Sequence, residues 1–98
     1  QDTFLAANYN LIEYTILLYI LAKKSGMYPK EMIHTMGDVH MYLDHIDAAK
    51  EQLTRHPRPQ PILELDASIA DKAVEIEVDD FELIGYMPHP FIKAKMSV

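Results

Sequence analysis

Side chains that could do chemistry cluster in nine consecutive residues, GDVHMYLDH (37–45). The stretch holds two aspartates, two histidines and one tyrosine: Asp38, Asp44, His40, His45 and Tyr42. These residue types could bind a metal ion, transfer protons as general acid and base, or hydrogen-bond a ligand. They could equally form the water-facing side of a β-strand, whose residues alternate between two faces.

Spacing decides between some of these chemistries. His40 and His45 are five positions apart, on opposite faces of a strand, and a metal site needs about three or more converging ligands. We therefore expect no metal site. Asp38 and His40 share a face, so an acid–base pair and a solvated polar pair both remain open. Two readings also remain open for Arg55 and Arg58, which could bind a phosphate or could be solvated surface residues.

Composition points to one soluble domain. The chain has 98 residues, 49% of them hydrophobic, and a net charge of −6, which argues against a nucleic-acid-binding scaffold. It has no cysteine, so disulfides and thiolate chemistry within the chain are excluded and a cytoplasmic setting is compatible. Residues 1–10 show no secretory signal, and the apolar run 16–22 is too short for a membrane span.

Residues 10–26 are expected to form the longest helix. Asn8 or Asn10 can cap its start, two lysines suit its last turn, and Gly26 suits the position after its end. Its apolar residues go most of the way round the helix: Leu11, Ile12, Tyr14, Ile16, Leu17, Leu18, Tyr19, Ile20 and Leu21. Because a helix that is apolar on all sides is normally buried, we expect it to lie inside a larger body.

The rest of the chain mixes strands and helices. We expect a strand over 31–43, an amphipathic helix over 44–57, a proline-bounded strand over 58–67, an acidic surface excursion over 68–80, and a short strand, turn and tail over 81–98. Asp44 is the expected cap of the second helix. The buried stripe of that helix should comprise Ile46, Ala49 and Leu53. The fold class is therefore α+β, without a regular alternation of strands and helices.

The strand over 31–43 should present its two faces differently. Gly37 in mid-strand suggests a bulge or a close backbone approach. Beyond it, His40 and Tyr42 share one face, whereas Met41 and Leu43 share the opposite face.

Four stretches resemble the C-terminal part of the thymidylate synthase superfamily, in the order found there. DTFLAANYNLIEY (2–14) is similar to D-x-F-L-G-x-P-F-N-I-A-x-Y, and HTMGDVHMYLDHI (34–46) to H-T-L-G-D-x-H-I-Y-x-N-H-I. EQLTRHPRPQPIL (51–63) resembles E-Q-L-x-R-x-P-R-P-x-P-x-L, and GYMPHPFIKAKMSV (85–98) resembles G-Y-x-P-H-P-x-I-K-M-x-M-A-V. The resemblance implies that 1–98 is the C-terminal fragment of a single domain, with a long buried helix packed on a mixed β-sheet.

The resemblance also implies a reaction. The family methylates dUMP to dTMP with 5,10-methylenetetrahydrofolate as donor of carbon and hydride, after a cysteine thiolate attacks the uracil. That cysteine belongs to a motif upstream of the stretches matched here, so we expect this fragment alone to be inactive. Members of the family are cytoplasmic homodimeric enzymes that use no metal. The resemblance therefore implies neither DNA nor a membrane as a partner.

The family's nucleotide-binding residues carry over to Asn10, His40, Met41 and Tyr42. Asn10 matches the asparagine that reads uracil, since a carboxamide offers both an acceptor and a donor to the pyrimidine edge. His40 and Tyr42 match the pair that binds the 3′-hydroxyl of the sugar, and Met41 lies between them. Asp2 matches the aspartate that binds the pterin ring of the folate, and we place it in the substrate-binding set as well.

The expected folate site comprises Asp2, Leu5, Ala6 and Tyr9, with Ser97 and Val98 in a tail that closes over the ligands. Several positions depart from the family pattern. Ala6 replaces a glycine, Asn8 a proline and Glu13 a small residue. Because these changes lie near the folate match, a dUMP or dCMP hydroxymethylase of the same superfamily, or a non-catalytic assembly module, remains an alternative.

Overall fold

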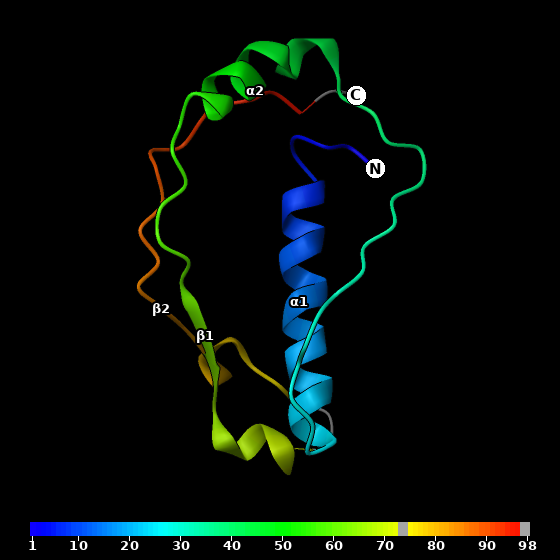
Figure 1. Ribbon diagram of the computed structural model, residues 1–98, viewed down its shortest axis with the longest axis vertical. Helices are drawn as coiled ribbons and strands as arrows, with labels where there is room; N and C mark the ends of the chain where they lie inside the picture. Colours follow the sequence, from blue (N-terminus) through cyan, green and yellow to red (C-terminus); the bar gives the residue numbers. More distant parts are fainter. Residues whose placement is uncertain (73–74, 97–98) are drawn as a thin grey trace.

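Residues 1–72 and 75–96 are described in the computed structural model, and this part of the chain confirms the α+β class. Helix α1 (Ala7–Lys24) stands in the centre, α2 (Ile46–Leu53) crosses one end, and strands β1 (Ile62–Leu65) and β2 (Phe81–Ile84) lie to one side (Figure 1). The sheet is two-stranded and antiparallel, so the expectation of a mixed sheet is wrong for the described residues.

Helix α1 begins earlier than the sequence suggests. Its N-cap is Ala6, which makes no side-chain capping bond, so the caps predicted at Asn8 and Asn10 are wrong. The entry is built by Asp2 instead. Its backbone carbonyl accepts from the amide of Ala7 at 2.8 Å, and its carboxylate accepts from the amides two and three residues further on.

The end of α1 matches its sequence signals. Lys23 and Lys24 occupy the last turn, and Gly26 adopts φ +65° directly after the C-cap. The amide of Met27 donates to the carbonyl of Ala22 at 2.8 Å, and that of Gly26 to Lys23 at 3.3 Å. These two bonds form the Schellman closure that a left-handed glycine permits.

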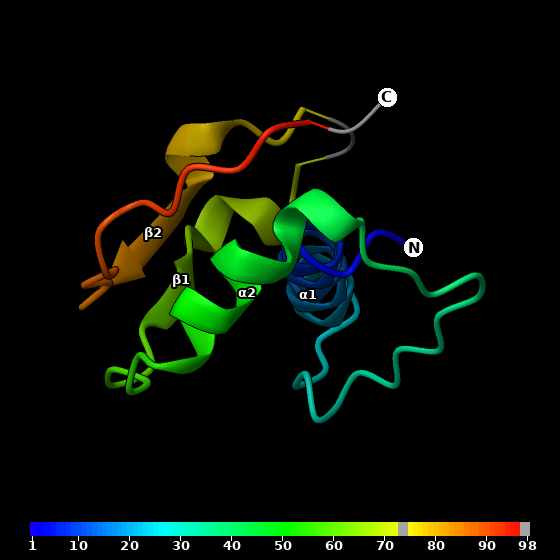
Figure 2. The same ribbon diagram turned by 90° about the horizontal axis from the view of Figure 1, so that it is seen from above.

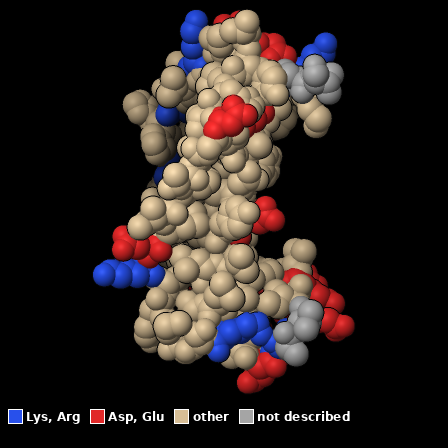
Figure 3. Space-filling model, turned by 90° about the vertical axis from the view of Figure 1, so that its right-hand side faces the viewer, with Lys and Arg blue, Asp and Glu red and all other residues tan. Residues whose placement is uncertain are grey.

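Helix α1 is only partly covered by the other described elements of this chain, so its expected burial inside a larger body stays a prediction. Ala22 is its one buried residue among those described, whereas Ile12 and Leu21 are 58% and 54% exposed. The physical reason is a shortage of packing partners, because the sheet is small and α2 lies at the end of α1. The side of the molecule seen in Figure 3 is largely uncharged, interrupted by separate acidic and basic groups.

The segment between α1 and α2 is extended but is not a strand. Within it, the described backbone forms one isolated bridge, a parallel pairing of His40 with Asp2. Alternating side chains allow an extended backbone, but a strand also needs a neighbour for its ladder of hydrogen bonds. Gly37 makes no close approach; the chain bends there, and the left-handed residue is Asp38 at φ +46°.

The second helix is shorter than predicted. A 3₁₀ turn over Leu43–His45 precedes α2, which ends at Leu53, and the N-cap of α2 is His45 rather than the expected Asp44. The buried stripe is also wrong in part. Ala49 is half-buried, but Ile46 is 37% exposed and Leu53 is 84% exposed.

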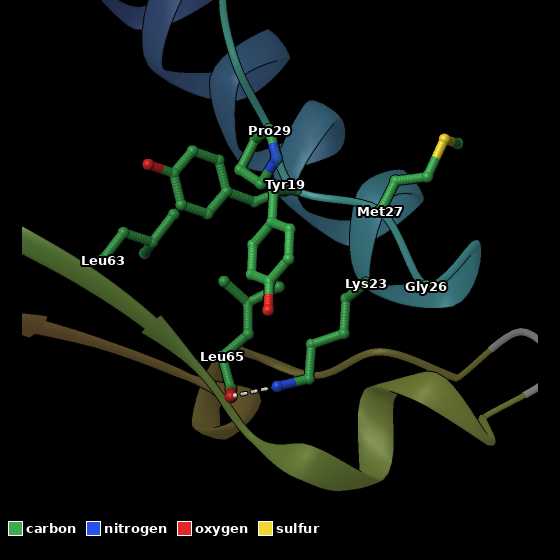
Figure 4. Close-up of a pocket in the computed structure, with 8 residues that line it drawn as sticks. Tyr19, Lys23, Gly26, Met27, Pro29, Leu63 and Leu65 are labelled. Atoms are coloured by element: carbon green, nitrogen blue, oxygen red, sulfur yellow. Dashed lines mark hydrogen bonds between the residues drawn. The ribbon is translucent and has the colours of Figure 1, made fainter.

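The connection between β1 and β2 packs against the end of α1. Ile69, in the 3₁₀ turn over Ala67–Ala70, is fully buried, so the expectation that 68–80 lies wholly on the surface is wrong. Lys23 donates to the carbonyl of Leu65 at 3.2 Å, across an open pocket of about 420 Å³ (Figure 4). Lys24 likewise binds the carbonyl of Lys72.

A buried acid completes this connection. Asp80 is 8% exposed, and its carboxylate accepts from the Lys72 ammonium at 2.5 and 2.7 Å and from the amide of Glu77 at 2.8 Å. The Lys72 ammonium and the Glu77 amide hold the pKa of Asp80 below its usual 3.8, and Asp80 raises the pKa of Lys72 above 10.5.

Among the described residues, no helix has the length and apolarity to cross a membrane.

Candidate functional site

The isolated bridge brings the N-terminal residues against the GDVHMYLDH stretch. The amide of His40 donates to the carbonyl of Gln1 at 3.1 Å, and the amide and hydroxyl of Thr3 both donate to the carbonyl of His40 at 3.0 Å. Asp2 therefore lies beside His40, although the two are far apart in sequence. Figure 1 shows the N-terminal segment next to the first turns of α1 and close to the start of α2.

The orientation of the His40 ring is fixed by one hydrogen bond. Its Nδ1 lies 2.7 Å from the carbonyl oxygen of Asp38. Because a carbonyl only accepts, Nδ1 carries a proton, and in the neutral ring Nε2 is an acceptor. The Asp38 carboxylate lies 3.7 Å from Nδ1 and is 95% exposed. The pair expected to share a face is thus joined mainly through the Asp38 backbone.

Four rings form a continuous row beside the bridge. His40 meets Tyr42 edge-on with centroids 5.3 Å apart, Tyr42 meets His45 at 5.7 Å, and His45 meets Phe4 at 5.5 Å. The edge-on arrangement is the favoured one for such pairs. His40 and Tyr42 therefore lie together, as two residues on one face of an extended segment should.

The carboxylate of Asp2 is held in place by the chain that follows it. Oδ1 accepts from the amides of Phe4 at 2.9 Å and Leu5 at 3.2 Å. Desolvation is the largest single effect and raises the pKa of Asp2, but these two hydrogen bonds and the neighbouring His45 and His40 together hold it below 3.8. Asp2 is therefore a fixed anion at neutral pH.

Asn10 lies on the second turn of α1, half-buried. Its Nδ2 donates to the side-chain oxygen of Gln1 at 3.4 Å, a long bond that leaves the carboxamide able to accept another partner. Since Gln1 also binds His40 through its backbone, Asn10 lies near the bridge.

An open groove of about 820 Å³ runs between the start of α1, α2 and the C-terminal segment. Three of the residues assigned to the expected nucleotide and folate sites line it: Leu5, Tyr9 and Met41. The C-terminal segment contributes Tyr86, Phe91 and Ile92. Ala6 is not among its lining residues, and Ser97 and Val98 lie outside the described part of the chain.

The two arginines left open by the sequence bind backbone carbonyls. Arg55 donates to Pro90 at 2.6 Å and to the Glu51 carboxylate at 2.8 Å, and Arg58 donates to the carbonyls of Met87 and Pro88. They fasten the end of α2 to the PHP turn (88–90).

Within the described ranges, no group of three or more acidic, histidine or cysteine side chains is placed so that it could hold a metal ion.

Comparison with known proteins identifies the family of this chain. The family model described as thymidylate synthase matches residues 1–98. The chain is 46% identical over 97 residues to the thymidylate synthase of Saccharomyces cerevisiae, which covers 99% of this chain and 32% of that protein. The thymidylate synthases of Corynebacterium aurimucosum and varicella-zoster virus are 46% and 43% identical over 97 residues, with 35% and 32% of their lengths covered.

The chain belongs to the thymidylate synthase family. It spans about a third of the length of the three curated relatives, and 99% of its own length is covered in each comparison. The stretches that resemble thymidylate synthases fall on the elements that build the site. Residues 2–14 form the bridge and the first half of α1, 34–46 carry the row of rings, and 51–63 and 85–96 are fastened together by the arginines.

One residue at the candidate site was not assigned a role from the sequence. His45 was expected simply to begin a helix, yet it is fully buried in the row of rings, and its Nε2 lies 2.6 Å from the carbonyl of Lys95. No local pattern reveals this contact, because the two residues are distant in sequence. The only signal was the histidine itself, placed three residues after Tyr42.

Proposed function

We propose that this chain is the part of a dUMP-methylating thymidylate synthase that holds the nucleotide and the reduced folate, within a longer polypeptide. The observation that carries the proposal is the Asp2–His40 bridge. It brings Asp2, matched to folate binding, beside His40, matched to nucleotide binding. The family membership and the 43–46% identity to thymidylate synthases support it.

The sugar end of the nucleotide is assigned to His40 and Tyr42. With Nδ1 of His40 donating to Asp38, Nε2 is free to accept from a ribose hydroxyl, and the Tyr42 hydroxyl can donate to the same oxygen or accept from it. Held edge-on, the two side chains offer one hydroxyl group both a hydrogen-bond acceptor and a hydrogen-bond donor.

The base is assigned to Asn10. A carboxamide presents an acceptor for uracil N3–H and a donor for O4, and its present bond to Gln1 is long enough to be exchanged for a bound base. A carboxamide that is free to turn by 180° could present the opposite pattern and bind cytosine. The preference for uracil over cytosine therefore depends on the neighbours that hold the side chain of Asn10 in one orientation.

The folate is assigned to Asp2 together with Leu5, Ala6, Tyr9 and the C-terminal tail. The carboxylate of Asp2, ionised and fixed by two amides, suits the N–H groups of a pterin ring. Leu5 and Tyr9 give the groove apolar and aromatic lining, with Tyr9 72% exposed and available for a ligand.

The chain contains no cysteine, so the nucleophile that attacks the uracil ring belongs to another part of the proposed polypeptide. We propose that another part of the polypeptide also covers α1, whose exposed apolar side chains include Leu11, Ile12, Tyr14, Leu17 and Leu21. The proposed enzyme is a homodimer, as the resemblance implies, and its reaction uses methylenetetrahydrofolate without a metal.

The test is an assay of the full-length polypeptide with methylenetetrahydrofolate and either dUMP or dCMP. Formation of dTMP with dihydrofolate, followed by ultraviolet absorbance, is the expected result with dUMP. Formation of a hydroxymethylated nucleotide together with tetrahydrofolate would show the hydroxymethylase alternative instead. That alternative is tested because Ala6, Asn8 and Glu13, which depart from the family pattern, lie on the entry and first turns of α1. No turnover of either nucleotide would support a non-catalytic module.

A further inference from the structure

His45 is a buried polar residue that packing alone does not explain. Its side chain is fully buried between the rings of Phe4 and Tyr42. Within the described part of the chain its Nδ1 is buried without a hydrogen-bond partner. A buried, unpaired polar atom carries a desolvation cost, and an apolar ring of the same shape would fill the space without it.

The other ring nitrogen accounts for the histidine. Nε2 lies 2.6 Å from the carbonyl oxygen of Lys95, and because a carbonyl only accepts, Nε2 is the donor. The bond reaches the C-terminal segment close to the end of the described chain. Upstream, the same segment is held by Arg55 at Pro90 and by His89, whose Nε2 lies 2.8 Å from the carbonyl of His56.

The contact links this segment directly to the candidate site. His45 touches Tyr42, which touches His40, and Phe4 follows the bridge formed by Asp2. Figures 1 and 2 show that the described part of the C-terminal segment ends near the start of α2, where the N-terminal segment also lies.

We infer that His45 is a positioning residue that anchors the C-terminal segment at Lys95 against the ligand site. The inference of an effect on turnover rests on the proposed function, because it concerns folate binding beneath that segment. The anchoring itself does not depend on any reaction. Loss of the anchor should weaken the step that needs the segment in place, which is folate binding and turnover, and should spare binding of the nucleotide alone.

Two substitutions separate the hydrogen bond from the shape of the ring. His45→Phe keeps the aromatic contacts and removes the donor to Lys95. His45→Gln keeps a donor, because the Gln side-chain amide nitrogen can take the place of Nε2. His34→Phe, in the exposed part of the 25–42 segment, is the matched control for replacing a histidine by phenylalanine.

A ligand-free readout tests the anchor. In the full-length polypeptide, trypsin should cut after Lys93 and Lys95 faster in the His45→Phe variant, by about 3- to 10-fold for the loss of one buried hydrogen bond. Wild type, His45→Gln and His34→Phe should be cut at similar rates. Equal cleavage of His45→Phe and wild type would overturn the anchor, and failure of Gln to restore protection would overturn the assignment to the hydrogen bond.

A change on the other partner guards against misfolding of the His45 variants. Semisynthesis that places an ester between Lys95 and Met96 weakens the carbonyl as an acceptor without altering the buried rings. Faster cleavage after Lys93 in this protein supports the anchor, and unchanged cleavage contradicts it.

Steady-state kinetics tests the consequence. His45→Phe should raise KM for methylenetetrahydrofolate about 3- to 10-fold and lower kcat, with the dissociation constant for dUMP alone unchanged. Equal loss of dUMP affinity would overturn the positioning role. If wild type itself neither binds dUMP nor methylates it, the proposed function fails, whereas the proteolysis results still decide the anchor.

Discussion

The imidazole of His40 lies edge-on against the phenol of Tyr42, with ring centroids 5.3 Å apart and planes at 86°. The ring of His40 is turned by its bond to the carbonyl of Asp38, so that Nε2 is left for a ligand. Under the proposed function, one sugar hydroxyl would bind both the imidazole of His40 and the hydroxyl of Tyr42.

We expect Tyr42→Phe to raise KM for dUMP in the full-length enzyme by about 3- to 10-fold. The substitution preserves the edge-on packing and removes one hydrogen bond, whose net value is about 0.5–1.5 kcal/mol. Because the hydroxyl group is lost from the sugar end, kcat should change less than KM. Steady-state kinetics with dUMP measures both. Tyr28→Phe, at a 95% exposed tyrosine, is the control and should leave KM unchanged.

Asn10→Asp should shift nucleotide preference from dUMP toward dCMP. A carboxylate accepts from the N4 amino group of cytosine but has no donor for O4 of uracil, and a mismatched buried polar pair costs about 1–3 kcal/mol. The ratio of kcat/KM for the two nucleotides should therefore change by about 5- to 150-fold. Asn8→Asp adds the same charge on the exposed first turn of α1 and should leave the ratio as it is. An unchanged ratio in Asn10→Asp would remove Asn10 from the base site.

The sequence predicted the features that depend on neighbouring residues. Local periodicity predicted the main helix and the closeness of His40 and Tyr42, and the glycine after the two lysines predicted the end of the helix. The structure confirms all three, with Gly26 at φ +65°. Those signals act within a few residues, so they can be recognised without knowledge of the fold.

Features that depend on distant partners were predicted less well. The segment 31–43 has the alternation of a strand, yet its one described bridge joins His40 to Asp2, and no ladder follows. Helix α1 was expected to be buried, but the partners that would cover it are lacking in this chain. The burial of Ile69 was missed for the converse reason, because an acidic, weakly patterned stretch conceals the residue that packs on α1.

The assignment of functional residues relied on the family resemblance. Spacing alone left Asp38 and His40 as either an acid–base pair or solvated groups, and only the four motifs in order pointed to a nucleotide. Even then His45 had no role, since its partner Lys95 comes from the far end of the chain.

Ile69→Ala should be the most damaging single truncation in the connection between β1 and β2. The side chain is fully buried against α1, and removing buried methylenes from such a site costs about 2–5 kcal/mol of the free energy of unfolding. Urea denaturation of the full-length protein measures the change. Leu53→Ala, at a site 84% exposed, is the control and should alter the free energy by less than about 0.5 kcal/mol. Similar losses in both variants would contradict the packing of Ile69 on α1.

The Lys72–Asp80 pair should make stability depend on pH at both extremes. The ammonium of Lys72 and the amide of Glu77 lower the pKa of Asp80 below 3.8, so the stabilisation from this carboxylate is complete above its ordinary pKa and is lost as pH falls through the lower, folded value. Asp80 raises the pKa of Lys72 above 10.5, so the contribution of this ammonium is complete below 10.5 and is lost as pH rises through the higher, folded value.

The Asp80→Asn variant isolates this pair, because the amide keeps an acceptor for the amide of Glu77 and loses the charge opposite Lys72. Wild type should be more stable than Asp80→Asn across neutral pH, and the difference should shrink below pH 3.8 and above pH 10.5. Denaturation curves over that range measure it, with Asp79→Asn on the exposed neighbouring residue as the control. A difference that stayed constant at low pH would show that charge at Asp80 does not stabilise the fold, because protonation would then remove nothing.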